Sequence, residues 1–253
     1  FNNINALGTG TINISNEAVL NPTTAMTIAN NIVLGNDGGV VSNDQTVTIS
    51  GIISGANDLI KEGTGRLILT GVNNTYNHTY LEEGILQISS AGSLGAGDLI
   101  VAGAAVLNPT TSMTLTSDIE LRGNGGVIDN EEQLVLTGAI TDDSPSTVLV
   151  KRGSGVLALD FSANTRQGIL QIEAGTVELR TTNSLGSEKI LLQDGTISTN
   201  MGENSIEFTN AFEFEGGAAG LFDIGTGDTL ILSGTISGSV PLTKRGLGRL
   251  AYT

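Results

Sequence analysis

Short runs in which every second residue is apolar recur along the whole chain, separated by Gly, Asn, Ser and Thr. Alternation with a period of two is typical of strands that bury one face, and helical periodicity is almost absent. The pattern therefore predicts an all-β chain of short strands. The paired apolar positions are Leu67/Leu69, Leu86/Ile88, Leu134/Leu136, Leu157/Leu159, Val177/Leu179 and Leu230/Leu232.

The chain also repeats itself over a longer distance. Residues 19–27 return as 106–114 with a single difference, Ala25 against Ser112. A segment of Lys followed by two spaced glycines occurs at 61–65, 151–155 and 244–248. These matches predict a unit of about 90 residues in three approximate copies. The copies are placed at 1–88, 89–179 and 180–253, within a single repeat region.

Short strands at this spacing fit coils of roughly 20 residues that stack along one axis. We therefore predict a right-handed parallel β-helix, or β-solenoid, of about a dozen coils. The alternative is a sandwich or an up-and-down barrel, but hairpin turns such as Asn124-Gly125 and Asp194-Gly195 are few. Because aromatic residues are only 4% of the chain, the core is expected to consist of Val, Ile, Leu and Ala.

Charge and cysteine content narrow the functional classes. The net charge of −15 argues against binding to nucleic acid or to anionic lipid, since no Lys/Arg cluster is present. The absence of Cys excludes disulfides, thiolate zinc sites and cysteine nucleophiles. The longest apolar stretch, 101–107, is far too short to cross a bilayer, so no direct membrane contact is expected from this segment.

Residues 59–76 combine Lys61, two spaced glycines, alternating leucines and a segment ending at Tyr76, Gly-Val-Asn-Asn-Thr-Tyr, which is Gly-x-Asn-x-Tyr with one additional residue. Together with the closing strands at 79–88 they resemble the autotransporter-associated β-strand repeat. The second copy keeps the glycines, the leucines and residues 175–179, but is expected to have lost Gly-x-Asn-x-Tyr. The resemblance implies secretion, display on the bacterial surface as part of an autotransporter passenger, and no catalytic residues.

Both ends of the chain align inside repeats. Phe1 falls opposite Ile88, and residues 249–253 stop opposite 66–70. Neither end has the polar cap that an isolated solenoid needs, so we expect the natural protein to continue on both sides.

Some β-helices cleave polysaccharides, so a lyase or hydrolase is the alternative function. Such chemistry needs carboxylates that converge with a base or with cations. Neighbours on one strand point to opposite faces, so the acidic pairs can form a site only in loops. All three are expected to be solvated turns: Glu82-Glu83, Glu131-Glu132 and Asp142-Asp143.

The remaining candidates also favour structural roles. His78 is the only histidine and is expected in a turn or on the surface. Lys61, Lys151 and Lys244 should lie about 20 Å apart along the axis as independent surface charges, with their stems over apolar edges. Residues 36–39 and 123–129 faintly resemble calcium-binding nonapeptides, but the nonapeptide does not iterate. Tight turns explain their glycines, so no metal or other cofactor is expected.

The sequence therefore predicts a structural or adhesive rod without catalytic, cofactor or metal site residues. As a part of a secreted surface protein it would mediate display or adhesion. The expected partner is a host-cell or matrix protein, or a neighbouring copy of the chain.

Overall fold

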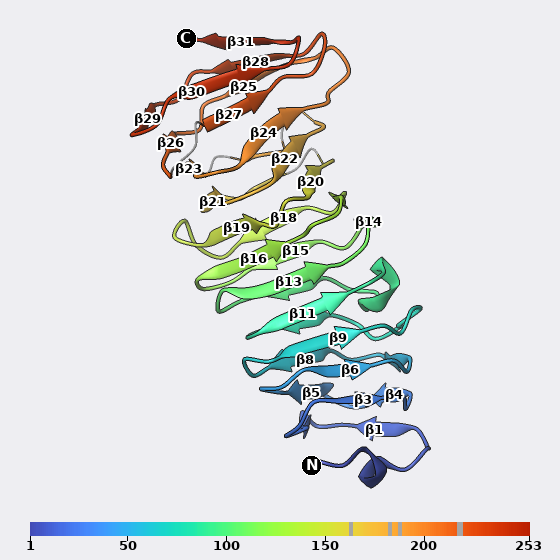
Figure 1. Cartoon of the computed structure of the whole chain (residues 1–253). Helices are drawn as coiled ribbons and strands as arrows, with labels where there is room; N and C mark the ends of the chain where they lie inside the picture. The colour runs from blue at the N-terminus through green and yellow to red at the C-terminus, as the bar shows by residue number, and fades with distance from the viewer. Residues whose placement is uncertain (162–163, 182–183, 187–188, 217–219) are drawn as a thin grey trace.

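The computed structural model describes residues 1–161, 164–181, 184–186, 189–216 and 220–253. Through them the chain winds into an elongated stack of coils with the two termini at opposite ends (Figure 1). Every strand pairing among these residues is parallel; Leu59, for example, lies beside Thr79 of the next coil. The predicted parallel β-helix is confirmed, with about 11 turns against the dozen expected.

Three long sheets form the faces of the described stack, and the chain visits them in a fixed order. Sheet 1 contains β2 (Ala18–Leu20), β5 (Gly39–Ser42), β8 (Leu59–Glu62), β10 (Thr79–Leu81), β12 (Leu99–Val101), β15 (Ile119–Leu121) and β18 (Ile140–Asp142). Sheet 2 contains β3 (Met26–Ile28), β6 (Val47–Ile49), β9 (Arg66–Leu69), β11 (Ile85–Ile88), β13 (Ala105–Pro109), β16 (Gly125–Asp129), β19 (Val148–Arg152), β21 (Ile169–Ile172), β23 (Lys189–Leu192), β26 (Phe212–Phe214) and β29 (Ile236–Gly238). Sheet 3 contains β14 (Met113–Leu115), β17 (Leu134–Leu136), β20 (Val156–Leu159), β22 (Thr176–Leu179), β24 (Thr196–Thr199), β27 (Gly220–Asp223) and β30 (Leu242–Arg245).

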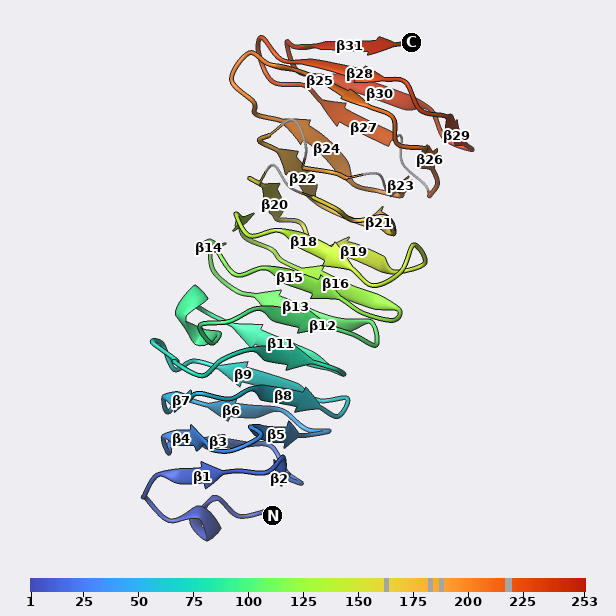
Figure 2. The same cartoon turned by 180° about the vertical axis from the view of Figure 1, so that it is seen from behind.

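Two short stacks complete the coils at either end of the rod (Figure 2). In chain order the first takes the place of sheet 3 near the N-terminus, and the second takes the place of sheet 1 near the C-terminus. Between them, turns and a short 3-10 helix, η2 (Ala91–Ser93), occupy the third face in some coils; another, η1 (Ile4–Leu7), precedes the first strand. The short stacks are β1 (Ile12–Ile14), β4 (Ile32–Leu34) and β7 (Ile53–Gly55), and β25 (Ser205–Phe208), β28 (Thr229–Leu232) and β31 (Arg249–Tyr252).

The core consists of columns of inward-facing side chains, one from each coil. Alternation along a strand sends one set of residues inward, and parallel register places each above its counterpart. All of the paired apolar positions read from the sequence are buried, with exposed fractions between 0% and 2%. One column of sheet 2 runs through Leu67, Leu86, Leu107, Ile128, Lys151, Ile172, Leu192 and Phe214.

The expectation of a purely aliphatic core is wrong near the C-terminus. Phe208, Phe212, Phe214 and Phe222 are all buried there. The ring of Phe222 packs edge-on against Phe212 and Phe214, with centroids 5.7 and 6.0 Å apart. The few aromatic residues cluster despite their low number, because contacts between aromatic rings stabilise the core beyond the burial of their area.

The lysine-glycine segments fall on a different face each time. Lys61 lies in sheet 1, Lys151 in sheet 2 and Lys244 in sheet 3. Sheet 1 contains β18 four coils after β8, and β19, which carries the second lysine, is the next strand in the chain and lies on the next face. Likewise, sheet 2 contains β29 four coils after β19, and β30, which carries the third lysine, follows on the next face. Successive segments therefore turn by one face about the axis, so they do not form a single stripe.

Candidate functional site

Each lysine-glycine segment forms a turn, and in the first of them the lysine folds into the interior. Lys61 is 0% exposed. Its Nζ donates to the carbonyl oxygens of Glu62 and Gly63, both at 2.6 Å, and to that of Glu83 in the next coil at 3.1 Å. Burial lowers the pKa of Lys61 to about 8, against the opposing effect of nearby carboxylates, chiefly Glu83. The ammonium group thus ties two successive turns together.

Lys151 repeats this arrangement in β19. Its Nζ donates to the carbonyl oxygens of Arg152 and Gly153 and lies 3.5 Å from that of Ala174 in the next coil. Burial likewise lowers the pKa of Lys151 to about 8. The chain crosses directly above the ammonium group at Gly175, where a Cβ would lie 2.8 Å from Nζ and φ is +69°. Only glycine fits this crossing without strain.

A buried asparagine from the coil below supports each of these turns. The Nδ2 of Asn43 donates to the carbonyl oxygens of Gln45 at 2.6 Å and Arg66 at 3.1 Å. Asn130 makes the equivalent pair of bonds beneath the second turn, one of them to Val156 at 3.0 Å. Neither asparagine stands out in the sequence pattern, although in both copies the asparagine directly precedes an acidic residue.

The prediction that the lysines are surface charges is therefore wrong for Lys61 and Lys151. The carbonyl groups of a tight turn need donors, and an ammonium group supplies up to three. Lys244 makes a related contact with the carbonyl oxygen of Gly246 at 2.5 Å, but it is only partly buried.

After the first lysine turn, the Gly-x-Asn-x-Tyr segment stands where a strand of the third face would lie. The Oδ1 of Asn74 accepts from the backbone N–H of Ile53 at 2.8 Å, and its Nδ2 donates to the carbonyl oxygen of Ser93 at 2.7 Å. This side chain thus bridges the coils on either side. Tyr76 is 0% exposed, its hydroxyl lies 2.8 Å from Thr79 Oγ1, and burial raises its pKa to about 12.

The second copy keeps the asparagine and replaces the tyrosine. Asn164 donates to the carbonyl oxygen of Ser184 at 2.7 Å, as its counterpart does to the equivalent serine. Arg166 is 1% exposed, donates to the carbonyl oxygen of Ile169 at 2.9 Å, and lies 3.6 Å from the carboxylate of Asp142. The motif is therefore lost as expected, with Phe161 and Arg166 in place of its Gly and Tyr, but its bridging asparagine remains.

Two of the acidic pairs lie in turns, as predicted. Glu82-Glu83 follows β10 and Glu131-Glu132 follows β16. The carboxylate of Glu131 accepts from the hydroxyl and the backbone N–H of Ser154, which lowers the pKa of Glu131. This glutamate therefore holds the second lysine turn from the coil below.

The third pair corrects the prediction of a solvated turn. Asp142 ends β18, and its side chain is only 4% exposed because it faces inward against Arg166. It also accepts from the backbone N–H of Gly168 at 2.9 Å. Asp143 is exposed and accepts from Gly123 N and Thr147 Oγ1 at 3.0 and 3.1 Å. The inward position of Asp142 could not be read from the doublet alone.

His78 lies in the turn before β10 and is partly exposed, which confirms its interpretation as a turn residue. Its Nδ1 accepts from the backbone N–H of Asp98 at 2.8 Å. The glycine-rich segments form turns with positive φ, for example +59° at Asp37 and +75° at Gly38. Among the described residues, no three His, Cys, Asp or Glu side chains gather in a way that could hold a metal ion.

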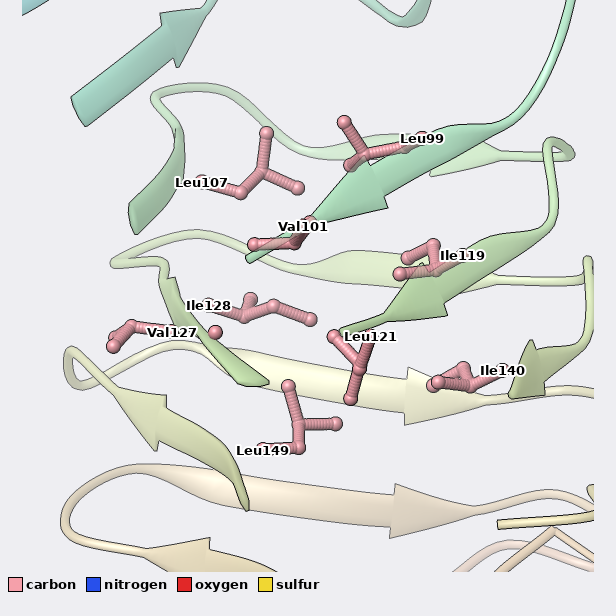
Figure 3. A pocket seen from close by; sticks show the side chains of 10 residues that line it. Leu99, Val101, Leu107, Ile119, Leu121, Val127, Ile128, Ile140 and Leu149 are labelled. Atoms are coloured by element: carbon pink, nitrogen blue, oxygen red, sulfur yellow. The ribbon is translucent and has the colours of Figure 1, made fainter. Parts of the chain in front are cut away.

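The interior offers little room for a ligand. A cavity of about 10 Å³ lies inside the coils between β12 and β19, lined entirely by core residues such as Leu107, Leu121 and Ile128 (Figure 3). This is about the size of one water molecule, so it is a packing gap. No helix in the described part of the chain is both long and apolar enough to cross a membrane.

Comparison with known proteins agrees with this architecture. The model of the passenger-associated-transport-repeat matches residues 59–88 and 149–179. Both matches begin in the strand that carries a buried lysine, Lys61 or Lys151, and end with the strand that follows Gly84 or Gly175.

The chain is also 35% identical over 162 residues to the adhesin BmaC autotransporter of Brucella suis biovar 1 (strain 1330). The match covers 63% of this chain and 5% of that protein. No solved structure matches the chain significantly. The resemblance drawn from the sequence is thereby confirmed: the chain is a β-helical segment with two stretches that match the repeat of autotransporter passengers.

Proposed function

We propose that this segment is a rigid, adhesive part of a protein secreted to the bacterial surface. The match to an autotransporter adhesin carries the proposal. The structure supports it physically, because the described coils form a continuous rod whose side chains project outward on several faces. Such a rod extends a binding surface away from the cell. The partner would be a host-cell or matrix protein, or a neighbouring copy, rather than nucleic acid or lipid.

The experiment is deletion of residues 1–253 from the parent protein, followed by measurement of bacterial adhesion to host cells and extracellular matrix. Antibody labelling of intact cells reports display of the remainder. Loss of adhesion with display retained supports the proposal. Full adhesion without this segment would show that the segment is only a spacer.

We further propose that the segment acts without catalysis. The carboxylates of Glu131, Asp142 and Asp143 are engaged in holding turns or the buried arginine. The purified chain should therefore leave pectin-like and other acidic polymers intact, with and without calcium. Turnover by the purified chain would contradict this and favour the lyase or hydrolase alternative.

A further inference from the structure

The outer face of sheet 1 carries an apolar ladder over four successive coils. Val40, Ile60, Tyr80 and Ile100 are register partners on β5, β8, β10 and β12. They point outward because their strand neighbours face the core. Ile60 and Tyr80 are partly exposed, and Val19, the next partner below, is 56% exposed. Val40 and Ile100 are only 5% and 3% exposed, so the accessible part of the ladder is Ile60 and Tyr80, with Val19 further along it.

Acidic residues border the ladder on both sides. Asp58, Asp98 and Asp118 each directly precede a strand of sheet 1 and so form one edge. Along the other edge, glutamates of successive turns surround a shallow open depression. Residues 1–122 contain ten Asp or Glu but only three Lys or Arg, which are Lys61, Arg66 and Arg122. The first is buried, and the second belongs to sheet 2. The residues that line the depression are Ser42, Glu62, Gly63, Glu82, Glu83 and Gly103.

The molecule itself places a guanidinium group on this face. Arg122 lies over the ring of Tyr80, with its carbon 5.7 Å from the ring centroid. It also donates to both carboxylate oxygens of Glu120, at 2.7 and 3.0 Å. This face thus binds a cation between an aromatic ring and a carboxylate. Cation–π attraction and ion pairing both stabilise that arrangement.

The outer face of sheet 2 differs in its charge. There the charges pair with each other, Arg152 with Glu173 and Lys189 with Glu213. The charges within these pairs neutralise each other, and Arg66 of the same sheet donates to the neutral side chains of Gln87 and Asn108. The acidic borders of the sheet 1 face instead favour a partner of opposite charge over a second copy of this chain, which carries −15 itself.

We propose that this acidic face (the ladder with its two acidic borders) docks a basic amphipathic helix of a partner protein. The ladder repeats every ~4.8 Å along the rod, close to the helix pitch of about 5.4 Å. A helix laid along the axis would place its apolar stripe on Ile60 and Tyr80 and its flanking Lys or Arg residues over the carboxylates. This inference rests on the proposed adhesive function and names the chemistry of its partner.

The test uses a labelled peptide of about 18 residues, roughly 27 Å long as a helix. Leucines at i, i+3, i+4 and i+7 form one stripe and lysines fill the other positions. One comparison peptide has the same composition with the leucines distributed around the helix, and another has glutamate in place of lysine. Fluorescence anisotropy with the whole chain measures binding. We expect binding of the striped lysine peptide alone, weakening as salt is added.

Variants locate the binding. The double variant Ile60→Ser/Tyr80→Ala should weaken binding at least about tenfold. The double variant Glu62→Gln/Glu83→Gln, which alters only exposed side chains, should weaken it several-fold. Glu207→Gln is the matched control, because Glu207 is an exposed glutamate on β25 near the other end of the rod. Equal binding of both lysine peptides, or unchanged binding in both double variants, overturns the inference. Circular dichroism checks that each variant is folded.

Adhesion assays separate this inference from the proposed function. If deletion of the whole segment abolishes adhesion but Ile60→Ser/Tyr80→Ala does not, the docking inference is wrong and the adhesive function stands. If the deletion leaves adhesion intact, the adhesive function itself is wrong. Sedimentation that shows a dimer lost in Ile60→Ser/Tyr80→Ala would assign the face to a second copy and overturn the choice of partner.

Discussion

Two corners of the coil, residues 71–76 and 164–166, follow the buried lysines and occupy the same place in the repeat with different chemistry. In the first, Tyr76 is a neutral side chain whose hydroxyl meets Thr79. In the second, Arg166 brings a charge into the interior, and Asp142 lies 3.6 Å from it. A buried hydroxyl needs one partner, whereas a buried charge needs an opposite charge as well. The arginine therefore makes its corner dependent on the coil below.

That dependence is visible in the preceding strand. Residues 53–55 and 140–142 are aligned in the repeat, and Gly55 stands where the second copy has Asp142. The asparagine at the corner is common to both copies and makes the same bridge to the next coil. Both copies thus keep the asparagine that hydrogen-bonds to the backbone. The interior side chain, Tyr76 or Arg166, differs together with the residue at the position of Gly55 or Asp142.

The largest effect is expected for Asp142→Ala. It removes the Asp142 carboxylate that lies 3.6 Å from the buried guanidinium of Arg166, so the free energy of unfolding should fall by about 3–5 kcal/mol. Urea denaturation followed by circular dichroism measures it. The exposed neighbour provides the control, since Asp143→Asn should cost less than about 1 kcal/mol. A loss below about 1 kcal/mol for Asp142→Ala would mean that the pair does not hold the corner.

Exchanging the residues of the two corners tests whether positions 142 and 166 depend on each other for stability. Arg166→Tyr alone removes the cation from the buried carboxylate of Asp142, and Asp142→Gly alone removes this carboxylate from the buried arginine. The double variant Arg166→Tyr/Asp142→Gly recreates the first corner. Its loss should be smaller than the sum of the single losses by at least about 1 kcal/mol, as a double-mutant cycle would report. Additive losses would show that the two positions are independent.

A smaller but still substantial loss is expected for Lys61→Met. The carbonyl oxygens of Glu62, Gly63 and Glu83 lose a donor, which should cost about 2–3 kcal/mol. Lys244→Met is the matched control, because that lysine is only partly buried and should cost less than about 0.5 kcal/mol. Equal effects at the two positions would contradict the interior role of Lys61.

The smallest effect is expected for Tyr76→Phe, which removes one buried hydrogen bond and keeps the ring. The free energy of unfolding should fall by about 1 kcal/mol because Thr79 Oγ1 loses its partner. Tyr80→Phe, on the outer face, should leave stability nearly unchanged. A loss at Tyr76 as large as at Asp142 would remove the contrast between the neutral and charged corners.

Local pattern explains why much of the fold could be predicted. Alternation over Leu67 and Leu69 identifies a half-buried strand, and regular turns between such strands indicate coils. The repeat at 59–88 indicates the passenger architecture. His78 and the glutamate pairs were placed in turns for the same reason: their neighbours in the chain determine whether a strand continues. The division into units at 88 and 179 stays a prediction.

The strands, the turns and their stacking could be predicted from the sequence, because each depends on residues a few positions apart. Tertiary structure alone decided that Lys61 faces inward, since the carbonyl of Glu83 reaches it only after a full coil. Tertiary structure also decided that Asp142 contacts Arg166, because these two residues lie in successive coils. The rotation of the lysine turns from sheet 1 to sheet 3 has the same origin. The face on which the next lysine turn lies depends on how many coils one repeat unit contains. That number depends on the lengths of all turns within the unit, and no single motif specifies their total.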